Sequence, residues 1–101
     1  KKRWNDIVEL LNRKEETSWK LAVMEADKLL DHVLKSMAIP GLNLGERLRF
    51  IQHKYPKIRN VWNAHKVRNR LVHEANFHLT RTQAIAAIKD FKRALELLSV
   101  L

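Results

Sequence analysis

One stretch of the sequence decides the fold class, residues 17–37, which read TSWKLAVMEADKLLDHVLKSM. Apolar residues recur in it at intervals of three and four, the spacing of one face of an α-helix: they are Trp19, Ala22, Val23, Ala26, Leu29, Leu30, Val33 and Met37. Thr17 or Ser18 is expected to cap this helix at its start. Pro40-Gly41 follows and stops it, because a helix interior does not accommodate that pair. We therefore predict a long amphipathic helix with one buried face.

The same reasoning predicts helices on both sides of this stretch. An amphipathic pattern covers residues 3–13, a short one runs from Gly45 to Tyr55, and another covers residues 57–73. Thr80-Arg81-Thr82-Gln83 has the form of a capping box and opens a last helix. No segment alternates apolar and polar residues for long enough to form a strand. The sequence therefore predicts an all-α fold, an antiparallel up-and-down bundle of four to five helices.

The composition is that of a single globular domain over residues 1–101. Hydrophobic residues make up 46% and charged residues 31%, a balance that allows one modest core. No cysteine is present, which excludes disulfides and cysteine zinc sites and is typical of a cytoplasmic protein. No apolar run has membrane-spanning length, and no signal peptide is visible. Because the sequence begins at Lys1 rather than Met, we expect a fragment of a longer chain.

Positive charge is concentrated in one part of the chain. The formal net charge is +9, from 20 Lys and Arg against 11 Asp and Glu. Between Arg47 and His73 there are eight Lys or Arg, three His and no acidic residue. A block of one sign attracts polyanions, although a merely solvated basic face has the same composition. We expect RNA or another phosphate-bearing partner.

The helix expected over residues 58–74 carries an unusual arginine. Projected at about 100° per residue, its apolar sector holds Val61, Ala64, Val67, Leu71 and Val72. Arg68 projects into the middle of that sector, where a charge is costly unless it is paired. Beside it runs a polar stripe of His65, Asn69 and His73, bordered by Trp62. One edge of the packing face therefore offers an arginine, an asparagine and two histidines.

Arginine and histidine together suit phosphate chemistry. The guanidinium of Arg68 is always charged and matches phosphate oxygens, while the imidazole of His73 can accept or donate a proton near neutral pH. Each has a structural alternative. Arg68 can form a buried ion pair with Glu25 or Asp27 on the long helix. His73 can simply be a favourable cation at the end of its helix.

Other kinds of site have little support in the sequence. His65 and His73 are eight residues apart, not the four that places two metal ligands on adjacent turns, so we expect no metal and no cofactor. Gly41 and Gly45 are isolated, which does not make a phosphate loop. A helix-turn-helix is disfavoured because the basic helix carries its apolar face through the basic residues. Trp62 is the tryptophan best placed to contact a ligand or a second subunit.

The stretch from Trp62 to Glu74, WNAHKVRNRLVHE, resembles the HEPN superfamily of small all-helical domains. The signature of that superfamily is an arginine, four to six residues and a histidine, usually with a polar residue directly after the arginine. Arg68, Asn69 and His73 match it with four residues between arginine and histidine. The layout is also similar, since one amphipathic helix follows the motif.

The resemblance implies metal-independent cleavage of RNA at a site shared by two subunits of a homodimer. Arg68 would stabilise charge on phosphorus, His73 would transfer protons, and Asn69 would orient the substrate or His73. The RNA-binding surface would include Arg59, Trp62, His65, Lys66 and Arg70. A cognate antitoxin or another partner protein is a further class of partner. The alternative is a non-catalytic HEPN-like module for nucleotide or RNA binding, dimerisation or partner docking, and beyond it a plain helical bundle in which Arg68 is a buried ion pair.

Overall fold

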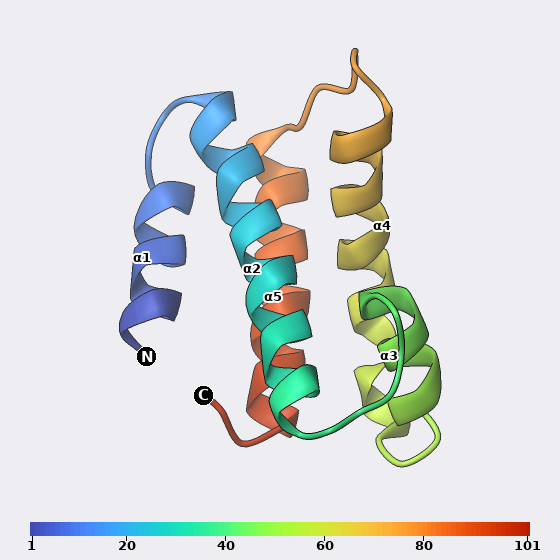
Figure 1. Ribbon diagram of the computed structural model, residues 1–101. Helices are drawn as coiled ribbons and strands as arrows, with labels where there is room; N and C mark the ends of the chain where they lie inside the picture. The colour runs from blue at the N-terminus through green and yellow to red at the C-terminus, as the bar shows by residue number, and fades with distance from the viewer.

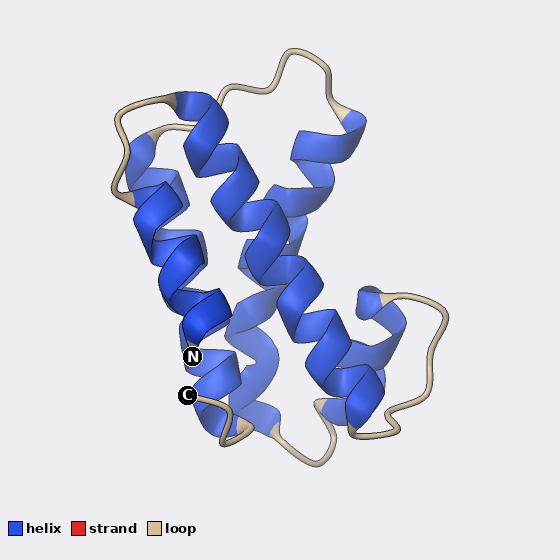
Figure 2. Ribbon diagram, turned by 60° about the vertical axis from the view of Figure 1, so that its left-hand side comes forward, coloured by secondary structure: helices blue, strands red, loops and turns tan.

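The computed structural model describes all residues from 1 to 101 and contains helices and loops only (Figure 2). In chain order the elements are α1 (Lys2–Leu11), α2 (Glu16–Ser36), α3 (Leu44–Ile51), the 3₁₀ helix η1 (Pro56–Asn60), α4 (Val61–His73) and α5 (Arg81–Leu97). The prediction of an all-α bundle of four to five helices is therefore confirmed.

The four longer helices alternate in direction along the chain (Figure 1). Helix α2 packs against α1, α4 and α5, and α5 packs against α4, so α2 and α5 occupy the centre. The short α3 contacts α2 and lies across the first turns of α4 (Figure 1). The two chain termini lie near one another at the same end of the bundle. This arrangement leaves one face of α4 beside α2 and α3, away from α1.

Local sequence explains the starts of some helices. Thr80 caps α5 through a complete capping box with Gln83, as predicted. The long helix starts earlier than expected, because Glu15 rather than Thr17 or Ser18 holds the N-cap position. Ser18 lies inside the first turn, where its hydroxyl donates to the Glu15 carboxylate at 3.2 Å. The segment expected as one helix over residues 57–73 is divided into η1 and α4, since Pro56 opens a tighter 3₁₀ turn.

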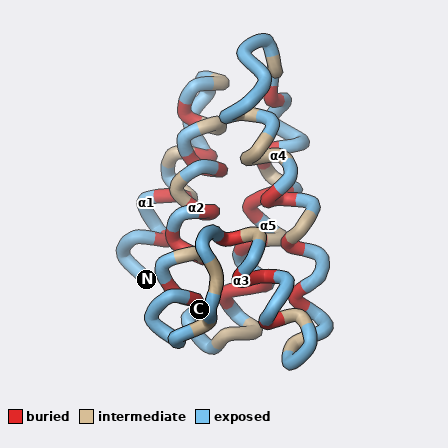
Figure 3. The backbone as a smooth tube through the Cα atoms, turned by 45° about the vertical axis from the view of Figure 1, so that its right-hand side comes forward, coloured by how far each residue is buried: buried red, intermediate tan, exposed pale blue.

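The core runs along the facing sides of α2, α4 and α5, while outward-facing residues are exposed (Figure 3). Its largest fully buried side chain is Phe91 on α5, and the other large, fully buried side chains of the same core include Ile7, Leu30, Leu34, Leu48, Ile51, Ile58 and Leu95. Val72, expected in the apolar sector of α4, is exposed instead. None of the helices has the length and apolar character needed to cross a membrane.

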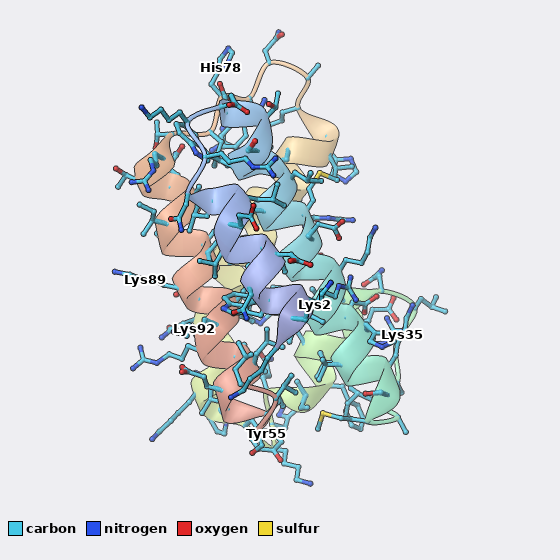
Figure 4. All side chains as sticks on the ribbon, turned by 90° about the vertical axis from the view of Figure 1, so that its left-hand side faces the viewer. Lys2, Lys35, Tyr55, His78, Lys89 and Lys92 are labelled. Carbon is cyan, nitrogen blue, oxygen red and sulfur yellow. The ribbon has the colours of Figure 1, made fainter.

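A carboxylate fastens the loop before α5 to the start of α2. The backbone N–H of Leu79 donates to Glu16 at 2.7 Å, and Lys20 and His78 lie 3.4 and 3.5 Å from the same carboxylate. Figure 4 places His78 on this loop, beside the first turn of α2. The hydrogen bond from Leu79 and the positive charge of Lys20 lower the pKa of Glu16 below its ordinary value of 4.5.

Truncating the central aromatic side chain is expected to cost much more than truncating an exposed one. Phe91→Ala removes a fully buried ring and leaves a cavity, so it should lower the free energy of unfolding by about 3–5 kcal/mol. Phe50→Ala, at an exposed position on α3, should change it by less than about 1 kcal/mol. Urea unfolding followed by circular dichroism compares the two variants, and equal losses would contradict this core.

Glu16 should stabilise the protein only where its carboxylate is ionised. Its pKa is lower in the folded than in the unfolded chain, so its contribution is present above pH 4.5 and is lost as the pH falls through the folded-state pKa. The melting temperature of Glu16→Gln is therefore expected to be lower than that of the wild type at pH 7. At pH 3 the two melting temperatures should be nearly equal. Glu96→Gln, at an exposed carboxylate on α5, is the control. If the difference in melting temperature between Glu16→Gln and the wild type did not change with pH, the ionised Glu16 carboxylate would not stabilise the fold.

Candidate functional site

A groove of ≈ 820 Å³ runs between α2 and α4 and is closed at one end by the start of α3. Its polar lining comes from three helices and the loop before α3: Glu25, Asp27, Lys28, Asp31, Asn43, Arg49, His65, Lys66, Arg68, Asn69 and His73. Leu21, Met24, Leu42, Leu44, Gly45 and Trp62 complete it. The three motif residues predicted from the sequence, Arg68, Asn69 and His73, therefore line one groove.

Arg68 is anchored but remains open to the groove. Its Nε lies 3.6 Å from Asp27 Oδ1, and its Nη1 donates to the Asn69 side chain at 3.1 Å. The side chain keeps 35% of its surface exposed, so the acid orients the guanidinium without sealing it away. The ion pair of Arg68 is thus with Asp27, whereas Glu25, which also lines the groove, contacts Arg3 and Lys28. Arg68 has further N–H groups available for a ligand.

The shortest polar contact in the groove joins α2 to α4. Asp27 Oδ2 and His65 Nδ1 are 2.7 Å apart, with 6% and 8% of their side chains exposed. Because a carboxylate only accepts, Nδ1 carries the proton in this pair. His65 was expected on the RNA-binding surface, but its ring is buried and its first role is to hold Asp27. The edge of Trp62 lies against it, with ring centroids 5.9 Å apart.

His73 is the exposed member of the motif. It is the last residue of α4, lines the groove and has no hydrogen bond or ion pair within the protein. Helical projection separates Arg68 and His73 by roughly 140°, yet both line the same groove. Glu74, which directly follows His73, pairs with Arg70 at 3.1 Å instead. Neither ring nitrogen of His73 therefore has a partner within the protein.

Two residues expected on the RNA-binding surface lie outside the groove. Arg70 follows Arg68 by two positions, which turns it by about 200° to the far side of α4. There its guanidinium pairs with Glu74 and lies 4.1 Å from the centre of the Phe77 ring. Arg59 is exposed on η1, before α4 begins. Trp62 and Lys66 line the groove.

Each acidic side chain in the groove contacts at least one basic side chain. Asp27 contacts His65 and Arg68, while Asp31 contacts Lys35 at 3.6 Å and the buried Arg47 at 2.8 Å. Glu25 is likewise next to two cations. By contrast, the exposed Arg49 and Lys66 have no acidic partner. The groove therefore presents uncompensated positive charge, which favours anionic ligands.

Several groove residues were not foreseen because α3 brings them in from another part of the chain. Asn43 caps α3 by accepting from Glu46 N–H at 2.9 Å, and Gly45 and Arg49 follow on the same helix. The pattern Asn43-Leu44-Gly45-Glu46 is an N-cap followed three residues later by glutamate, which signals a helix start. That signal would have placed the start of α3 at Leu44, before Gly45. It does not reveal that α3 lies against α4.

No group of three or more His, Asp or Glu side chains is positioned to hold a metal ion.

Comparison with known proteins adds no relative. No protein-family model matches the chain, and no curated protein or solved structure matches it.

Asp27 is expected to contribute more to the free energy of unfolding than Glu25 on the same helix. Asp27→Ala leaves the buried His65 Nδ1 without an acceptor, which should lower the free energy of unfolding by about 1–3 kcal/mol. Glu25→Ala removes an acid of similar size from a partly exposed position on the same helix, with an expected change below about 1 kcal/mol. Urea denaturation at pH 7 measures both. If the two losses are equal, the buried pair does not stabilise the junction of α2 and α4.

Proposed function

We propose that this chain is a HEPN-like domain that binds RNA in the groove between α2 and α4 and cleaves it without a metal ion, as a homodimer. The ligand class is single-stranded RNA, whose phosphates are accessible from one side.

The observation that carries the proposal is that Arg68, Asn69 and His73 line one positively charged groove. Arg68 is held by Asp27 and Asn69 so that its orientation is fixed before a ligand arrives. Preorganised donors stabilise developing charge without having to reorganise during the reaction. His73 is exposed and has no competing partner.

The proposed reaction is internal transesterification. The ribose 2′-oxygen forms a bond to the adjacent phosphorus, and the bond from phosphorus to the 5′-oxygen breaks. The products are a 2′,3′-cyclic phosphate and a free 5′-hydroxyl. His73 takes the proton from the 2′-hydroxyl, and the partner's His73, as imidazolium, gives one to the departing 5′-oxygen. Arg68 donates to the non-bridging oxygens, on which negative charge increases in the transition state.

Exposed apolar residues in the lining of the groove support contact with a second copy of the chain. Leu21 and Met24 are exposed on α2, and Leu42 is 90% exposed in the loop before α3. A twofold dimer covers the same patch on both subunits. Packing along the α2 edge would bring two His73 side chains toward one site and leave Arg49 and Lys66 accessible to RNA. The dimer thereby supplies the acid and the base that the reaction needs.

Cleavage of a labelled RNA of mixed sequence, with EDTA present, tests the proposal. Wild-type protein should produce fragments ending in 2′,3′-cyclic phosphate. Arg68→Ala and His73→Ala should each lower the rate by at least about 100-fold, because one removes charge stabilisation and the other removes proton transfer.

Matched substitutions outside the groove serve as controls. Arg81→Ala removes the same charge from an exposed position on α5, and His53→Ala removes an exposed imidazole after α3. Both should cleave like the wild type, and sedimentation should give all variants the same dimeric mass. RNA binding without cleavage by the wild type would reduce the protein to a non-catalytic module. Cleavage that survives His73→Ala would contradict the role of His73 in proton transfer.

A further inference from the structure

Helix α3 turns a basic and aromatic side to solvent. Arg49 and Phe50 are exposed on it, and Lys54 is exposed one helical turn beyond Phe50. Phe50 is 56% exposed and is the only aromatic residue among the large hydrophobic side chains that are exposed. Lys54 Nζ lies 5.8 Å from the centre of the half-buried Tyr55 ring, within the range of a cation–π interaction. Arg49, Phe50, Lys54 and Tyr55 are called the α3 surface below.

No carboxylate offsets the positive charge of the α3 surface. Neither Arg49 nor Lys54 lies within ion-pair distance of an acid. Glu46 is the one acid in α3, and η1 contains none. The Glu46 carboxylate accepts the backbone N–H of Leu42 at 3.0 Å, so it is occupied by the loop before the helix. The α3 surface therefore favours an anionic partner.

The α3 surface is continuous with the groove through Arg49, which lines the groove and is exposed on α3. Helix α3 lies across the first turns of α4, at the end opposite His73 (Figure 1). Since α4 has 13 residues, its two ends are about 20 Å apart. Lys57 and Arg59, exposed on η1 and also without an acidic partner, extend the basic surface beyond α3. A strand that follows the groove away from His73 therefore meets further unpaired cations.

Unpaired bases stack on aromatic side chains while the phosphates between them pair with Lys and Arg. We propose that the α3 surface is a second contact for single-stranded RNA outside the groove, where one base stacks on Phe50 and neighbouring phosphates pair with Arg49, Lys54 and Lys57. The inference rests on the proposed function, because the strand is the one that places another phosphate at the cleavage site. Stacking accepts every base, so this contact favours long strands without selecting their sequence.

Binding of labelled 2′-O-methyl oligouridylates of increasing length, followed by fluorescence anisotropy, tests the stacking contact apart from cleavage, because these strands lack the attacking 2′-hydroxyl. Phe50→Leu keeps an exposed apolar side chain but removes the ring, so it should weaken the binding of long strands by about tenfold. Strands too short to leave the groove should bind Phe50→Leu and the wild type equally. Phe50→Trp, which restores a stacking surface, should bind long strands at least as tightly as the wild type. Equal affinity of Phe50→Leu and the wild type at every length would overturn the proposal.

The salt dependence of the same binding tests the phosphate contacts. Each phosphate contact of a single strand contributes about 0.7 to the slope of log affinity against log salt, so a double variant with Lys54→Gln and Lys57→Gln should reduce that slope by about 1.4. The matched control is a double variant with Lys2→Gln and Lys92→Gln, at exposed lysines on α1 and α5 (Figure 4). The control should keep the wild-type slope. Equal reductions in the two double variants would mean that RNA responds to net charge alone, which would contradict a contact at the α3 surface.

Cleavage assays distinguish the α3 surface from the cleavage site. For a long RNA, Phe50→Leu should raise KM about tenfold while kcat changes little, because it loses binding remote from the reacting phosphate. Arg68→Ala should lower kcat, and adding Phe50→Leu to it should still weaken the binding of long strands. If Phe50→Leu weakens binding but Arg68→Ala does not impair cleavage, the proposed function fails and the α3 surface stands. If Arg68→Ala abolishes cleavage and Phe50→Leu behaves like the wild type, the α3 surface fails and the proposed function stands.

Discussion

The structure depends most on the carboxylate of Asp27, which is buried between α2 and α4. It contacts His65 at 2.7 Å and lies 3.6 Å from Arg68 Nε, so one side chain fixes two residues of the neighbouring helix. Burying a carboxylate destabilises a fold unless the carboxylate is paired and hydrogen bonded. Asp27 has such partners only if α4 is rotated about its axis so that His65 and Arg68 face α2. The same contact that secures the packing therefore sets which residues of α4 face the groove.

The rotation of α4 about its axis determines which of its residues face the groove. Arg68 and His65 point toward α2, and Lys66 and His73 lie along the groove. Arg70 points away and is neutralised by Glu74 beneath the Phe77 ring. The basic residues of α4 therefore fall into two groups. Arg70 is paired on the outside of the bundle, and Lys66 is unpaired in the groove. The acids that line the groove on α2 are paired with neighbouring cations, whereas Arg49 and Lys66 have no acidic partner.

Much of the fold followed from local pattern. The length of α2 was readable because its apolar residues recur at helical spacing, and the start of α5 because Thr80 and Gln83 form a capping box. Arg68 was recognisable as a special residue because it interrupts an apolar sector. Two predicted helix starts were wrong. The long helix begins after Glu15 and not at Thr17 or Ser18, and Pro56 opens a 3₁₀ turn before α4. Arg70 and Arg59 lie outside the groove, because charge alone does not say which side of a helix faces a groove.

The sequence by itself determined the helices, the basic stretch and the motif of Arg68, Asn69 and His73, because each depends on spacing along one segment. Only the tertiary structure decided that Asp27, and not Glu25, anchors Arg68, and that Gly45 at the start of α3 lies against His65. These pairs are distant in the chain and are brought together by the packing of α2, α3 and α4. Periodicity identifies a buried face, but the neighbour of that face is set by how the whole core fills its space.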